Sequence, residues 1–189
     1  MRSMAAEVPK LELEEVIARQ DWPALRRIAR AQSAKTVRFL VSRLYTPEDA
    51  NRQKVIQALE EIAGDPEIFS EGKLRELLRR FFWWLSDESG AVPFGIPEAI
   101  GAVLKARPEL QPDFLPLICS MAHDPEVFQT GSIERGVFWA LGHIGRPAAL
   151  CSPDAVKTVA DAAQHHPDPD TRATATWALG RMEAIEPGN

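Results

Sequence analysis

The sequence contains few cysteines: Cys119 and Cys151 are the only two among its 189 residues. Two thiols in a chain of this size cannot build the disulfide framework of a small secreted domain. We therefore expect both to be reduced thiols in a cytoplasmic protein. The first ten residues also lack the long apolar run of a signal peptide, which agrees with that location.

Long apolar runs and strand signals are scarce as well. No segment approaches the roughly 18 apolar residues of a membrane span, so we expect no membrane attachment. Alternating β-branched residues do not occur, whereas apolar residues spaced i, i+3, i+4, i+7 run through the chain. Because hydrophobic residues make up 45% of the sequence, a sizeable core is possible, and the pattern predicts an all-α protein.

The sequence also lacks an excess of positive charge and lacks catalytic motifs. A net charge of −5 argues against nucleic acid, which binds basic surfaces. There is no HExxH, no CxxC and no glycine loop that could cradle a phosphate. His165 and His166 could be drawn as a metal site with Asp168 and Asp170, but helix capping already explains both acids. We therefore predict no catalytic residue, no metal and no cofactor.

Capping signals mark where helices should begin. Ser152 and Asp168 are each followed by a proline and then an acid, and residues 46–49 repeat this order. Such a sequence places a capping side chain, then proline at the first helical position, then a negative charge in the first turn.

One helical segment recurs four times. The copies align on four alanines at steps of 41, 41 and 38 residues, namely Ala58, Ala99, Ala140 and Ala178. In each copy the apolar residues fall at i, i+4 and i+7, which forms one buried stripe. Partner helices are expected between the copies, at residues 34–44, 71–85, 110–122 and 154–164. A period of about 40 residues built from helical hairpins is typical of a solenoid.

Three glycines share one column of this alignment: Gly101, Gly142 and Gly180. Glycine inside a helix costs about 1 kcal/mol relative to alanine. We therefore predict that a neighbouring helix passes each of them too closely for a side chain.

Two segments of the sequence resemble the repeats of a known family. They are Arg135…Trp139-Ala140-Leu141-Gly142 and Asp168…Arg172…Trp177-Ala178-Leu179-Gly180, and they look like HEAT-like repeats of the subtype first met in phycocyanobilin lyases. The resemblance covers residues 34–184, and Pro93 and Pro97 depart from it. It implies a right-handed α-α superhelix, a short solenoid of about four to five hairpins. Its expected parts are capping helices at 1–32 and one array over 33–189, with repeats at 33–64, 65–106, 107–146 and 147–185.

Two further columns lie beside the buried stripe. One contains Glu98, Trp139 and Trp177, and the other, four residues on, contains His143 and Arg181. Residues four apart share a helix face, so we expect these side chains along a concave wall. Tryptophan and arginine dominate binding interfaces. The alternative is that the tryptophans fill gaps between repeats.

The segment 87–95 is unusually rich in acids, glycine and proline. Pro97 is tolerated only in a first turn, so regular helix should resume near Ile96. We expect the segment to form an ordered loop at the mouth of the groove, because loops on rigid scaffolds often carry function. The alternative is a proline-rigidified turn with its tryptophans in the core. The complete predicted binding surface is Trp83, Trp84, Asp87, Glu88, Glu98, Arg135, Trp139, His143, Trp177 and Arg181.

The sequence thus predicts a non-catalytic scaffold that binds a protein or peptide partner in its concave groove. The first alternative is a lyase-like or chaperone-like module that handles a cofactor or its apoprotein. In that case Asp87, Glu88, Glu98 and His143 would handle a proton or a cationic group. The second alternative resembles the DNA-repair glycosylases built from HEAT-like helices, and the acidic balance argues against it.

Overall fold

The computed structural model describes residues 10–45, 50–86, 94–123 and 131–183. Every regular element in these ranges is a helix, which confirms the all-α prediction. The first six helices are α1 (Lys10–Ala18), α2 (Trp22–Ala31), α3 (Ser33–Arg43), α4 (Ala50–Ala63), α5 (Glu71–Leu85) and α6 (Ile96–Ala106). They are followed by η1 (Pro108–Leu110), α7 (Gln111–Met121), α8 (Gly131–Ile144), α9 (Arg146–Cys151), α10 (Pro153–His165) and α11 (Pro169–Glu183). Within the same ranges, no helix has both the length and the apolar character that a membrane crossing requires.

The repeated segments and their partners occupy the predicted helices. The aligned copies lie in α4, α6, α8 and α11, and the expected partner helices are α3, α5, α7 and α10. The short helix α9 was not predicted. It follows Gly145, whose φ of +79° lies in the left-handed region that glycine adopts most easily, so the chain can turn sharply after α8.

The predicted caps are present wherever the structure describes them. Ser152 accepts a hydrogen bond from the backbone N–H of Ala155 at 3.1 Å. Asp168 accepts from the backbone N–H of Thr171 at 2.9 Å and from its hydroxyl at 2.6 Å. Helix α6 begins at Ile96 with proline in its first turn, as expected. The capping signal at residues 46–49 lies outside the described residues.

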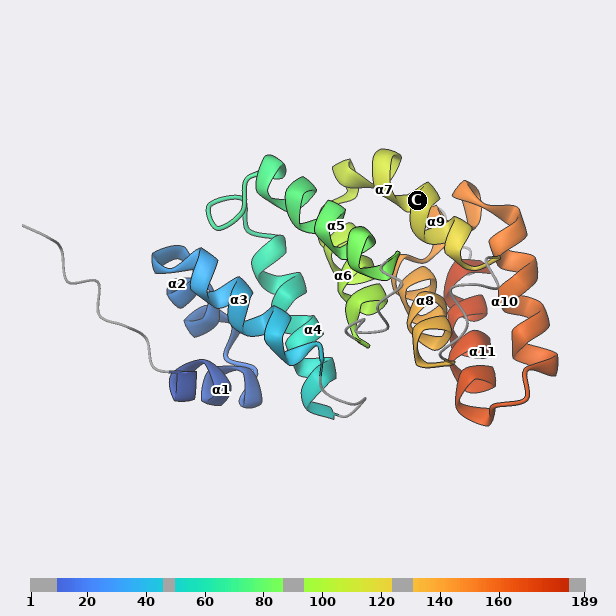
Figure 1. The fold of residues 1–189 in the computed structure, drawn as a ribbon, viewed down its shortest axis with the longest axis horizontal. Helices are drawn as coiled ribbons and strands as arrows, with labels where there is room; N and C mark the ends of the chain where they lie inside the picture. Colours follow the sequence, from blue (N-terminus) through green and yellow to red (C-terminus); the bar gives the residue numbers. More distant parts are fainter. Residues whose placement is uncertain (1–9, 46–49, 87–93, 124–130, 184–189) are drawn as a thin grey trace, which may run out of the picture.

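Four helices form one row in the order α4, α6, α8, α11 (Figure 1). Helix α6 packs between α4 and α8 and also contacts α5 and α7. Because it is enclosed in this way, every residue of α6 from Ile96 to Leu104 is buried. Helices α1 and α2 lie beside α4 at the N-terminal end of the row.

Two glycines bring helices of this row close together. A Cβ atom on Gly101 would lie 2.7 Å from Cα of Ala140, and one on Gly142 would lie 2.5 Å from Cα of Ala178. The close-approach prediction is therefore confirmed at both positions. It is wrong for Gly180, where a Cβ would meet no neighbouring atom of the described residues within 4 Å. Gly180 is exposed on the final helix of the described row, so no further helix packs against it.

The two cysteines lie in different environments. Cys119 is buried in α7, with its Sγ atom 3.9 Å from the carbonyl oxygen of Ala148, whereas Cys151 is exposed at the end of α9. Burial, assisted by the neighbouring Cys151, raises the pKa of the Cys119 thiol to about 12. A rise of this size lowers the thiolate fraction at neutral pH roughly a thousandfold.

We therefore predict that iodoacetamide labels only Cys151 rapidly in the folded protein at pH 7.5, because the thiolate is the reactive species. Intact mass spectrometry over time measures the rate. Cys119→Ser should keep the fast reaction, and Cys151→Ser should lose it. Rapid labelling of folded Cys151→Ser would contradict the assignment.

Candidate functional site

Three predicted side chains stack against one another on α8 and α11. The rings of Trp139 and His143, one turn apart on α8, have centroids 4.5 Å apart and planes inclined by 15°. The ring of Trp177, on α11, lies 6.1 Å from that of Trp139 at 18°. Trp177 is 40% exposed, while Trp139 is half-buried and packs against the core. The shared repeat column therefore does place the two tryptophans side by side.

The stack continues to an acid that the sequence analysis missed. His143 Nε2 lies 2.7 Å from Oε2 of Glu60 on α4, although the two residues are 83 positions apart. Helix α6 lies between α4 and α8 but contributes only the buried Ala102 at the column of His143. Because alanine is short, side chains of α4 and α8 can meet across it. The sequence contains one indication of this contact. In the repeat alignment, Glu60 stands at the position that Gly101 holds in the next repeat.

We call Glu60, His143, Trp139 and Trp177 the stacked row. It runs from α4 across α6 to α8 and α11. Each member contacts the next, so the exposed ring of Trp177 rests against the ring of Trp139.

Glu98 does not belong to this surface, so the prediction that it contributes to the binding surface was wrong. Its side chain is buried, and its Oε1 atom lies 3.0 Å from Nη2 of Arg52, which is buried as well. Gly136 on α8 makes room for the carboxylate, since a Cβ there would lie 2.6 Å from Oε2 of Glu98. Helix α6 is enclosed by its neighbours, so the predicted column faces protein at this repeat and solvent only at later ones.

Arg135 and Arg181 have separate positions. Arg135 lies 3.5 Å from the carboxylate of Asp170 and 3.8 Å from that of Asp168, so it ties α8 to the start of α11. Arg181 is exposed in the last turn of α11. Arg135 therefore connects two helices, whereas the side chain of Arg181 is exposed at the surface.

The two tryptophans at the end of α5 lie on a helix outside the row. Trp83 is 62% exposed. Trp84 is half-buried against Phe81, with ring centroids 5.9 Å apart, and the guanidinium of Arg80 lies 4.8 Å from its ring centroid. The other predicted site residues of this region, Asp87 and Glu88, lie outside the described residues.

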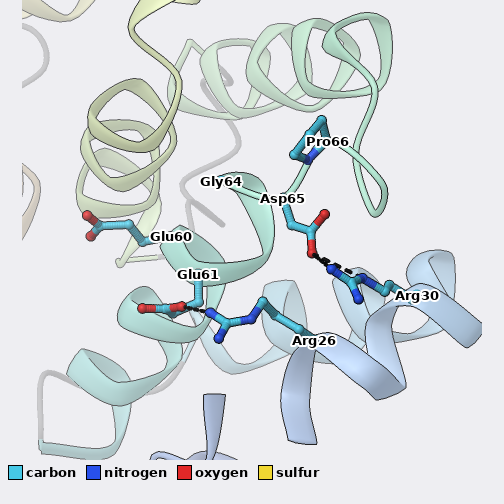
Figure 2. Close-up of a pocket in the computed structure, with 7 residues that line it drawn as sticks. All are labelled: Arg26, Arg30, Glu60, Glu61, Gly64, Asp65 and Pro66. Carbon is cyan, nitrogen blue, oxygen red and sulfur yellow. Dashed lines mark hydrogen bonds and ion pairs between the residues drawn. The ribbon is translucent and has the colours of Figure 1, made fainter. Parts of the chain in front are cut away.

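An open pocket of about 450 Å³ adjoins the acidic end of the stacked row (Figure 2). Two ion pairs cross it from α2 to the end of α4 and the turn that follows: Arg26 to Glu61 at 2.5 Å and Arg30 to Asp65 at 2.7 Å. Burial by itself would raise the pKa of the Asp65 carboxyl, but hydrogen bonds from Arg30 and the backbone outweigh it and hold that pKa below its usual value. Residues lining the pocket are Arg26, Arg30, Glu60, Glu61, Gly64, Asp65 and Pro66.

The paired histidines near the end of α10 have separate partners. His165 Nδ1 lies 3.0 Å from Asp161, and His166 Nε2 lies 3.1 Å from Glu134. Asp168 caps α11, as described above. In the part of the chain that the structure describes, no group of three or more His, Cys, Asp or Glu side chains could hold a metal ion.

Neither any protein-family model nor any curated protein matches the sequence of this chain. The resemblance to HEAT-like repeats therefore rests on the internal alignment and on the helices that follow it.

Proposed function

We propose that the protein is a non-catalytic scaffold of HEAT-like hairpins that binds a peptide segment of a partner protein along the stacked row. The proposal includes a right-handed α-α superhelix. Support comes from helix pairs that recur about every 40 residues. It also comes from equivalent glycine–alanine contacts at two successive steps of the row, Gly101 on Ala140 and Gly142 on Ala178.

The observation that carries the binding proposal is the exposed ring of Trp177 stacked on Trp139. Tryptophan supplies a large contact area and is enriched among residues that dominate interface energetics. An indole held by stacking loses little conformational freedom when a partner binds, which favours affinity. A partner side chain that is apolar or cationic fits the face of such a ring.

The other end of the row is polar. Glu60 lines the pocket on α2 and α4, where carboxylates and guanidiniums alternate. A bound segment would meet aromatic rings at α11 and charges at α4. It should therefore bind in one preferred direction.

Trp177→Ala should abolish most of this binding while leaving the fold intact, because the ring is partly exposed and lies at the edge of the core. We expect recovery of a specific partner from native lysate to fall at least about tenfold, the size of effect typical of an interface hot spot. Quantitative affinity capture with wild type and variant measures it. The partner, once identified, is then titrated directly against both.

Trp83→Ala is the matched control, since it removes an exposed tryptophan from α5. It should leave recovery unchanged. If Trp177→Ala and Trp83→Ala retain the same partners at the same level, the stacked row is not the binding surface.

A further inference from the structure

The partner helices α3, α5 and α7 are not equally closely packed against one another. Helices α5 and α7 are joined by an ion pair between Arg75 and Asp113 at 2.5 Å and by the stacked rings of Phe82 and Phe114, 6.2 Å apart. Between α3 and α5, by contrast, the described residues leave a groove of about 740 Å³. No hydrogen bond or ion pair crosses it between the described side chains that line it.

This groove has an apolar floor. Phe69 and Leu77 are buried there, and Val37 is half-buried. Hydrophobic side chains at the bottom of an open groove offer burial to apolar groups of a partner.

The rims of the groove are basic. Arg38 lies on α3, and Lys73 and Arg80 lie on α5, all three exposed. The acid that lines the groove is Glu76. Arg38 and Lys73 form no ion pair with any described residue, so both charges are available to a ligand. This local excess of positive charge contrasts with the net charge of −5 carried by the whole chain.

We propose that the α3–α5 groove is a second binding surface, which takes an acidic amphipathic peptide segment of a partner protein. Leucine-like side chains would lie on the floor formed by Val37 and Leu77, and carboxylates would pair with Arg38 and Lys73. The net charge of the whole protein repels an acidic segment, whereas the cations of the groove attract it, so charge complementarity directs the segment to the groove. The surface is separate from the stacked row and does not depend on its function.

A fluorescein-labelled synthetic helix of about a dozen residues, with leucines on one face and glutamates on the other, is the probe. Fluorescence anisotropy should show saturable binding that weakens as salt is added. The same peptide with lysines in place of the glutamates should not bind. The double variant Arg38→Glu, Lys73→Glu should raise the Kd for the acidic probe at least about tenfold. Val37→Ser should also weaken binding, because it makes the floor polar.

The double variant Arg79→Glu, Lys105→Glu is the matched control, because both cations are exposed outside the groove and the net charge changes equally. It should keep most of the affinity, as should Trp177→Ala. Equal losses in both double variants would mean non-specific charge attraction and overturn the proposal. It is also overturned if the acidic probe does not bind, or if single-stranded DNA of equal charge binds more tightly with the same dependence on Arg38 and Lys73.

Discussion

Replacing Gly142 with leucine is expected to lower the free energy of unfolding by about 1–3 kcal/mol, the usual cost of overpacking. The new Cβ would lie 2.5 Å from Cα of Ala178 and 2.7 Å from the ring of Trp177. Because the nearer of these atoms belongs to the backbone, α8 and α11 would have to separate. Urea denaturation followed by circular dichroism measures the loss.

Gly180→Leu is the matched control for this experiment. A Cβ at this position would meet no neighbouring side chain or helix within 4 Å in the described part of the chain, so leucine should fit. Leucine is also a better helix former than glycine by up to about 1 kcal/mol. We therefore expect unchanged or higher stability for Gly180→Leu. If both variants lose the same stability, close approach is not what requires glycine at position 142.

Glu98→Gln should cost about 3–5 kcal/mol, because it removes the negative charge that faces the buried Arg52 guanidinium. Both side chains of this pair are almost completely buried, at 1% and 3% exposure. The pair joins the start of α4 to the start of α6, so its loss affects the centre of the row. Guanidinium denaturation with tryptophan fluorescence measures the change.

Two further variants test the electrostatic origin of that loss. Glu76→Gln makes the same chemical change at an exposed position of α5 and should alter stability by less than about 0.5 kcal/mol. Arg52→Met combined with Glu98→Met removes both charges, and it should be less destabilised than Glu98→Gln alone. A loss below about 1 kcal/mol in Glu98→Gln would contradict the argument.

The helices themselves were predictable from the sequence. The start of α6 at Ile96 follows from the fixed backbone geometry of Pro97, and the cap at Ser152 follows from side-chain chemistry within one turn. The stacking of Trp139 on His143 also follows from their spacing of four residues. All of these depend on residues close together in the chain.

Which helix faces are covered was decided only by the tertiary structure. Glu98 shares a column with Trp177, yet it is buried because α4, α5, α7 and α8 pack around α6, while α11 ends the described row. Gly142 and Gly180 share another column, but among the described helices one packs against Gly142 and none against Gly180. Likewise, the contact between Glu60 and His143 and the groove between α3 and α5 depend on the distances between helices. Helical periodicity determines which residues share a face, whereas the packing of distant segments determines what that face meets.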